Sequence, residues 1–253
     1  MTSHTNKVSS AIACADPRMA ADATKLPSGA ILLPPPHADS RTAPTLLVHF
    51  PGAFCPADSY TSFAQATQAA ALSQGVSMCV CIVKYPPNWI PFLWGSGILL
   101  RPGQLLRMLT DAISELHNFL EDQQAGSSSA TTSSSGPDPR GGGFTSLFLS
   151  GHSLGSVNIQ ALSALLSSNS NSKELPEGAA DVPALRGLIL LGGYLQNDKE
   201  DLPGVPVATI LGDRDGLVKL SRYNTLYSWV SERLPDTSMR AVKAPLAILQ
   251  VCS

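Results

Sequence analysis

Charged residues are scarce in this chain of 253 residues: Asp, Glu, Lys and Arg together make up 14% of it. The 17 Lys and Arg residues are scattered among 19 Asp and Glu residues, which gives a formal net charge of −2. A protein that binds nucleic acid needs a stripe of basic side chains to face the phosphate backbone, and the sequence has none. We therefore expect no nucleic-acid partner.

Cysteine is also rare, and its spacing excludes two kinds of site. An odd number of unevenly spaced cysteines forms no disulfide framework, and no C-x-x-C pair of a metal site is present. Two of the five lie in an apolar run with the composition of a strand. We expect reduced thiols in an intracellular protein, with no metal and no cofactor. The five cysteines are Cys14, Cys55, Cys79, Cys81 and Cys252.

The distribution of hydrophobic residues predicts neither a secretory signal nor a membrane-spanning segment. Residues 1–29 contain no apolar segment after a basic start, so no secretory signal is predicted. The first 15 residues are rich in Ser, Thr and Ala, a weak feature of organellar transit peptides; because Asp16 and Asp22 follow, we favour an ordinary disordered terminus. One lysine and three prolines interrupt the apolar residues 76–100. We expect no membrane span and a cytoplasmic location.

Strand-like and helix-like segments alternate along the chain, and 43% of the residues are hydrophobic. Helical spacing is found over residues 60–75, 102–120 and 217–234. The alternation predicts an α/β fold with a mostly parallel, twisted sheet and helices on both faces. Short apolar runs typical of buried strands are residues 45–50, 76–85, 144–150, 184–194, 205–213 and 244–252.

The length suits one domain with a sizeable core. We expect an irregular N-terminal segment over residues 1–40 and a single domain over residues 41–253. Two stretches within it, near residues 125–143 and 167–181, are rich in Ser, Gly, Pro and Asn. Such segments bury too little apolar surface to offset their ordering entropy, so we expect flexible insertions there.

The stretch Gly151-His152-Ser153-Leu154-Gly155 stands between an apolar strand and a helical run. A serine on a sharp turn from strand to helix presents its Oγ at the carboxyl edge of the sheet, and the flanking glycines leave room for the turn. The bare G-x-S-x-G pattern is common by chance, but this placement makes it specific. The alternative is a tight turn that happens to contain a serine.

Three separated motifs make residues 45–252 resemble the α/β-hydrolase fold family of serine hydrolases, and within it a dienelactone-hydrolase-like branch. Besides Gly151–Gly155, "HFPGAFCPADSY" at residues 49–60 is similar to the loop that supplies the oxyanion hole. "ILGDRDGLV" at residues 210–218 is similar to the strand end that carries the catalytic acid. The resemblance implies the α/β-hydrolase fold and acyl transfer to a serine.

The resemblance also implies a role for each matching residue. Ser153 would be the nucleophile that forms an acyl-enzyme. The backbone N–H groups of Leu154 and Ala53 would stabilise the oxyanion, with Pro51 and Gly52 setting the shape of the loop. Asp215 would be the acid that orients a histidine. Asp213, two positions earlier, is the alternative, and we prefer Asp215 by the spacing in the family.

The histidine of the expected triad is missing. In this fold the acid precedes the histidine in the chain, yet no histidine follows Asp215. His49 ends a strand at the catalytic edge and is the one tolerable substitute, although its equivalent in the family shapes the oxyanion loop. The five histidines are His4, His37, His49, His117 and His152.

In the family that this chain resembles, the histidine follows the last strand almost at once, which is about where Ser253 stands. We therefore expect a C-terminally truncated sequence, the alternative being a lost histidine. The chain as written should be nearly inactive, because removal of one triad member leaves a residual acceleration of about 10³ to 10⁴ over water.

Aromatic residues make up only 6% of the chain, yet residues 85–100 concentrate several of them in a Pro-rich segment after a strand. Trp89, Phe92 and Trp94 are candidates for an apolar wall around an acyl or alcohol group, the alternative being packing of a long loop on the core. The leading hypothesis is a serine hydrolase of carboxylic esters or related small acyl compounds. The rival is a catalytically inactive binding protein of the same fold.

Overall fold

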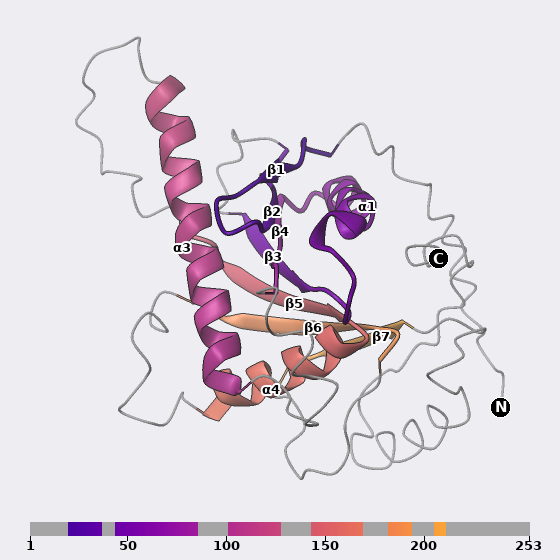
Figure 1. Cartoon of the computed structure of the whole chain (residues 1–253). Helices are drawn as coiled ribbons and strands as arrows, with labels where there is room; N and C mark the ends of the chain where they lie inside the picture. The colour runs from indigo at the N-terminus through magenta and orange to yellow at the C-terminus, as the bar shows by residue number, and fades with distance from the viewer. Residues whose placement is uncertain are drawn as a thin grey trace, which may run out of the picture.

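A single sheet of seven strands forms the centre of the computed structural model, which describes residues 20–36, 44–85, 101–127, 143–168, 182–193 and 205–210 (Figure 1). The strand order across the sheet is β1-β2-β4-β3-β5-β6-β7. The strands are β1 Thr24–Lys25, β2 Ile31–Leu33, β3 Thr45–Phe50, β4 Met78–Ile82, β5 Ser146–His152, β6 Leu185–Leu191 and β7 Val207–Ile210.

The five strands β4, β3, β5, β6 and β7 run parallel to one another, so their carboxyl ends meet at one edge. β2 runs antiparallel to β4, and β1 antiparallel to β2. Near-continuous apolar runs such as Leu46–Val48 in β3 are fully buried, as strands covered on both faces require. The predicted α/β class with a mostly parallel sheet is confirmed.

Helices cover both faces of the sheet (Figure 1). The short 3-10 helix η2 (Ala57–Tyr60) and α1 (Thr61–Ser73) lie on one face, and α3 (Pro102–Ser127) and α4 (Leu154–Ser168) on the other. Because side chains alternate along a strand, β3 contributes to two cores. Leu46, Val48 and Phe50 pack with α3 and α4, whereas Leu47 packs with Tyr60 and Ala64.

Part of the segment expected to be irregular belongs to the sheet. Residues 1–40 were predicted to lack regular structure, but β1 and β2 fall within them. The reason is that Ile31–Leu33 is wholly apolar and buries its side chains beside β4, after a turn in which Gly29 has a φ of 86°. The sheet therefore starts before residue 41, and the expectation of one domain stays a prediction.

Two boundaries also differ from the prediction. α3 runs to Ser127, three residues into the expected insertion at 125–143, and α4 runs to Ser168, the second residue of the insertion expected at 167–181. Both differences are of the size by which helix ends vary. The helix expected at 217–234 and the strand expected at 244–252 lie outside the described residues.

Candidate active site

Ser153 occupies the single residue between β5 and α4 and has a left-handed backbone, with a φ of 50°. Residues other than glycine adopt this conformation rarely, and each instance costs about 1 to 3 kcal/mol. Two backbone hydrogen bonds hold the turn: the Ser153 N–H donates to the Leu191 carbonyl oxygen at 2.8 Å, and the Ser156 N–H donates to the Ser153 carbonyl oxygen at 2.9 Å. The turn thus stands at the carboxyl edge of the sheet, between β5 and β6.

Neither glycine beside Ser153 can accept a side chain. A Cβ on Gly151 would overlap the backbone of Gly155, and a Cβ on Gly155 would overlap the carbonyl oxygen of Phe50 at the end of β3. The neighbours are backbone atoms, so a rotamer change cannot relieve the overlap. The glycine spacing that singled out this motif is therefore a geometric requirement of the turn.

Ser156 stabilises the turn through side-chain hydrogen bonds to its backbone. The sequence analysis did not predict this role. Its buried hydroxyl donates to the Gly151 carbonyl oxygen at 2.6 Å, with the Leu191 carbonyl oxygen at 3.2 Å. A Cβ on Gly193 would lie 2.5 Å from the Ser156 Cβ, so the chain after β6 also passes close to this serine. Nothing in the spacing of the sequence distinguishes Ser156 from other serines of the helix.

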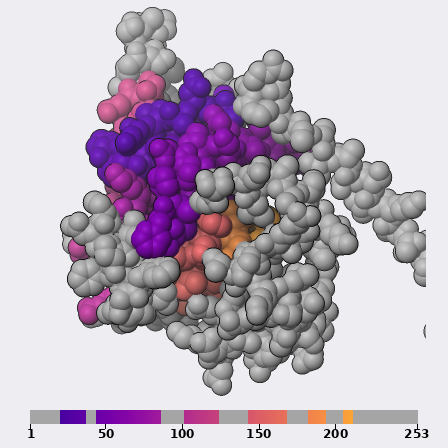
Figure 2. Space-filling view, turned by 45° about the vertical axis from the view of Figure 1, so that its right-hand side comes forward, coloured from indigo at the N-terminus to yellow at the C-terminus, as the bar shows by residue number. Residues whose placement is uncertain are grey.

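The loop after β3 comes against the turn at Ser153. The Cys55 N–H donates to the Gly52 carbonyl oxygen at 3.3 Å, which closes a four-residue turn, and Phe54 within it has a φ of 62°. The Gly52 N–H donates to the Tyr60 hydroxyl at 3.0 Å. That hydroxyl lies 2.7 Å from Nδ1 of His152, the residue before Ser153. In Figure 2 the purple surface of the chain after β3 adjoins the salmon surface that includes β5 and α4.

Leu154 and Ala53 are therefore on two segments that contact each other. Leu154 is the first residue of α4, where an N–H group has no acceptor within the helix. Ala53 is half-buried at the second position of the turn closed by Gly52 and Cys55. Two backbone N–H groups in such positions can stabilise a developing oxyanion.

His49 is fully buried beneath this loop. Its Nδ1 is 3.0 Å from the Ser150 hydroxyl, and its ring lies 4.5 Å from that of Tyr60 and 5.2 Å from that of Phe63. Burial, and then the charge of nearby His152, lowers the pKa of His49 from 6.5 to about 3. A group with so low a pKa takes a proton poorly at neutral pH, so His49 is unfavourable as a general base.

The remaining histidines and predicted site residues lie away from the Ser153 turn or outside the described residues. His117 is in α3, with its ring stacked on Phe144 at 5.6 Å. The other predicted site residues, together with two histidines, fall outside the described residues: Asp215, the alternative Asp213, Trp89, Phe92, Trp94, His4 and His37.

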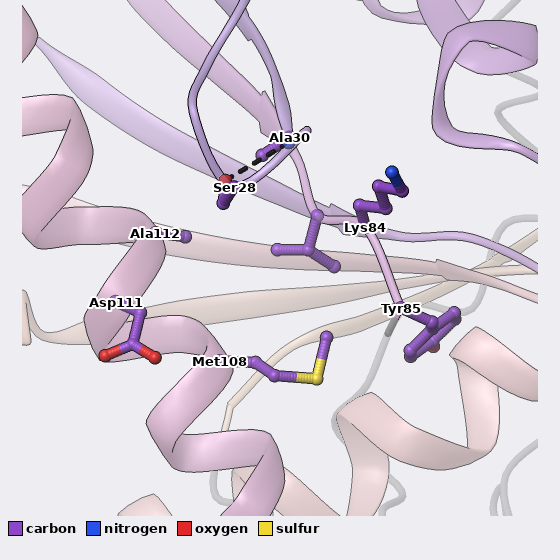
Figure 3. Close-up of a pocket in the computed structure, with 8 residues that line it drawn as sticks. Ser28, Ala30, Lys84, Tyr85, Met108, Asp111 and Ala112 are labelled. Atoms are coloured by element: carbon purple, nitrogen blue, oxygen red, sulfur yellow. Dashed lines mark hydrogen bonds between the residues drawn. The ribbon is translucent and has the colours of Figure 1, made fainter. Parts of the chain in front are cut away.

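A cavity of about 340 Å³ lies between the β1–β2 turn, the end of β4 and α3 (Figure 3). Its wall is formed mainly by apolar groups, and Ser153 is not among the residues that line it. Tyr85 on this wall accepts a hydrogen bond from the Asn158 side chain of α4 at 2.8 Å. The cavity is therefore a neighbour of the helix that follows Ser153, separate from the serine itself. It is lined by Ser28, Ala30, Val83, Lys84, Tyr85, Met108, Asp111 and Ala112.

Among the described residues, no group of three or more His, Cys, Asp or Glu side chains is arranged to hold a metal ion. None of the helices described has the length and apolar character needed to cross a membrane.

No protein-family model matches the chain, and no curated protein sequence matches it. Solved structures similar to it include an α/β serine hydrolase without a lid from Xanthomonas campestris, with 16% identity, a TM-score of 0.37, and coverage of 84% of this chain and 78% of that one. A dienelactone-hydrolase-like promiscuous phosphotriesterase from metagenomic libraries has 12% identity, a TM-score of 0.42, and coverage of 84% and 76%. A bacterial heroin esterase has 14% identity, a TM-score of 0.33, and coverage of 71% and 45%.

Because these TM-scores are low, we assign the fold from the molecule itself. The sheet is mostly parallel with helices on both faces, and the serine turn joins β5 to the following helix. The loop after β3 reaches the same turn. These are the structural requirements of a nucleophile elbow at the top of an α/β-hydrolase sheet. As its sequence predicted, the chain has the α/β-hydrolase fold.

Proposed function

We propose that the chain is a serine hydrolase of carboxylic esters or related small acyl compounds, acting through an acyl-enzyme on Ser153. The observation that carries this proposal is the left-handed backbone of Ser153 between two glycines that have no room for a Cβ. Backbone strain of this kind persists where the surroundings enforce it, and it concentrates at active sites. An ordinary turn would place glycine at the strained position itself.

In the proposed reaction the Ser153 Oγ attacks the carbonyl carbon, and the carbonyl oxygen becomes an oxyanion. The backbone N–H groups of Leu154 and Ala53 would stabilise it. The Gly52 N–H already donates to Tyr60, which favours the next amide, that of Ala53, as the donor from this loop. Loss of one such donor costs about 2.7 to 4 kcal/mol of transition-state stabilisation.

Asp215 is proposed as the acid of the triad, with Asp213 as the alternative. Its function would be to orient a histidine and to stabilise the imidazolium that forms when the Ser153 proton is taken up. Trp89, Phe92 and Trp94 are proposed to form the apolar wall for the acyl or alcohol group. Membership of a dienelactone-hydrolase-like branch stays a prediction.

A catalytically inactive binding protein of the same fold is the second candidate. One observation favours it: buried His49, the histidine at the end of β3, has a pKa of about 3 and takes up a proton poorly at neutral pH. A serine without a general base is a weak nucleophile at neutral pH. The two candidates differ in whether Ser153 reacts.

Labelling by a fluorophosphonate probe distinguishes them, with Ser153→Ala as the control. Free imidazole in the buffer offers a base to a site that lacks one. We expect slow labelling of the chain, faster labelling with imidazole, and none in Ser153→Ala. Absence of labelling with and without imidazole, in this chain and in one extended by a C-terminal histidine segment, would remove the hydrolase proposal.

A further inference from the structure

The Tyr60 hydroxyl lies between the loop after β3 and the turn that bears Ser153. It accepts the Gly52 N–H at 3.0 Å, and it is 2.7 Å from Nδ1 of His152. Tyr60 is 3% exposed and its hydrogen bond with Gly52 is buried, whereas the bond to His152 is partly buried. Gly52 and His152, which are distant in the chain, are thus joined through one side-chain oxygen.

The Tyr60 ring is itself held from several sides. Tyr60 is the last residue of η2 and immediately precedes α1, so its backbone is fixed by two helical segments. Its ring packs against His49 with the ring centroids 4.5 Å apart, and it belongs to the core on the α1 face of the sheet. A side chain anchored in this way can hold a loop in place.

The backbone of the loop after β3 is closely packed at Gly52. A Cβ on Gly52 would lie 2.7 Å from the His152 Nδ1 and 3.3 Å from the Tyr60 hydroxyl oxygen. The backbone at Gly52 therefore sits directly against both partners. Ala53, the proposed oxyanion donor, follows Gly52 at once, so its position depends on this contact.

We propose that Tyr60 and His152 are positioning residues, which set the oxyanion loop at its distance from the Ser153 turn. This inference rests on the proposed function for its effect on catalysis. The Tyr60 oxygen accepts from Gly52, and its own hydrogen goes to the His152 Nδ1. In this hydrogen bond Nδ1 is the acceptor, so the ring hydrogen of His152 lies on Nε2.

The test compares Tyr60→Phe with a matched control, Tyr85→Phe. Both substitutions remove one hydroxyl from a buried tyrosine, but the Tyr85 hydroxyl bonds to Asn158 and has no part in the loop. We expect the fluorophosphonate labelling rate of Ser153 to fall about 10- to 100-fold in Tyr60→Phe, since a displacement of about 1 Å can cost about 100-fold. Tyr85→Phe should label at a rate within about twofold of wild type. Equal rates for the two variants would overturn the inference and leave the proposed function standing.

Substitution of His152 tests the same link from its other end. The side-chain amide in His152→Asn keeps an acceptor near the position of Nδ1, whereas His152→Leu has none. We expect His152→Asn to label within about threefold of wild type and His152→Leu to match Tyr60→Phe. If the labelling rate falls equally in both His152 variants, a hydrogen-bond acceptor at this position has no role and the inference is wrong.

Nuclear magnetic resonance tests the link without any activity. The ¹⁵N shifts of His152 should report an unprotonated Nδ1 that accepts a hydrogen bond, and this signature should be lost in Tyr60→Phe but kept in Tyr85→Phe. Exchange of the Gly52 amide hydrogen should become about five- to tenfold faster in Tyr60→Phe, because its hydrogen bond is gone. If the wild type is never labelled, the proposed function fails. If the ¹⁵N shifts of His152 and the exchange rate of the Gly52 amide are unchanged in Tyr60→Phe, the positioning contact is refuted.

Discussion

Gly155, the second residue of α4, lies directly against the carbonyl oxygen of Phe50, the last residue of β3. A Cβ on Gly155 would overlap that oxygen and would stand 2.7 Å from the Pro51 carbonyl oxygen. Both neighbours are backbone atoms that cannot rotate away. The start of α4 is thereby fixed against the end of β3, and Ser153 is held beside the loop that begins at Pro51.

Replacement of Gly155 by alanine should therefore destabilise the fold. We expect the free energy of unfolding in urea to fall by about 1 to 3 kcal/mol, the usual cost of overpacking, although alanine is the better helix former. Gly103→Ala is the matched control, since a Cβ at that position in α3 meets nothing within 4 Å. Gly103→Ala should be neutral or stabilising by up to about 1 kcal/mol. Equal effects of the two substitutions would contradict the close packing at Gly155.

The sequence was sufficient to predict the central strands and the serine turn because each is specified locally. β3 is a short, mostly apolar run, and its bounds agree with the prediction. The glycines of the turn are required by backbone atoms close to them in space, and their spacing of four residues records that requirement. Patterns of this kind are visible without any knowledge of the tertiary structure.

The contacts that join distant segments could not be predicted in the same way. β2 has three residues, too few to show a periodicity, and it is a strand because β4 lies beside it. The loop motif at residues 49–60 ends at Tyr60, but the sequence could not show that the Tyr60 hydroxyl meets His152. Such a contact depends on the register of β3 with β5, which only the assembled sheet provides.

The strain at Ser153 predicts a difference between two inactive variants. Glycine adopts a φ of 50° without steric cost, whereas alanine in the left-handed region costs about 1 to 2 kcal/mol. We expect Ser153→Gly to be more stable than Ser153→Ala by about 1 kcal/mol in urea unfolding, and neither to react with the fluorophosphonate probe. The reverse order of stability would show that the backbone at Ser153 is unstrained.

Buried His49 should make the fold sensitive to acid. Its pKa in the folded chain, about 3, is below its ordinary value of 6.5, chiefly because burial disfavours the charged form. Between these two pH values the unfolded chain binds a proton that the folded chain does not, so stability falls as the pH falls from 6.5 towards 3. The loss is at most about 1.4 kcal/mol per pH unit.

A difference between two proteins isolates this effect from other titrating groups. Urea unfolding of wild type and of His49→Asn is measured at about pH 7 and about pH 5, on either side of the ordinary histidine pKa. We expect the wild type to lose up to about 2 kcal/mol more than His49→Asn over this interval. An equal loss in both proteins would mean that His49 titrates normally in the folded chain.

The thiols of Cys79 and Cys81 in β4 should resist alkylation while the chain is folded. Burial raises the pKa of both thiols, and that of Cys81 reaches about 12. The thiolate is the species that reacts with iodoacetamide, and at about pH 8 a thiol with such a pKa is ionised in only about one molecule in 10⁴. Both side chains are at most 1% exposed, so the reagent also lacks access to them.

Mass spectrometry of the peptide that contains both residues should find it unmodified in buffer and fully alkylated in urea. Alkylation in buffer at the rate seen in urea would show that β4 opens readily to solvent, against its central place in the sheet.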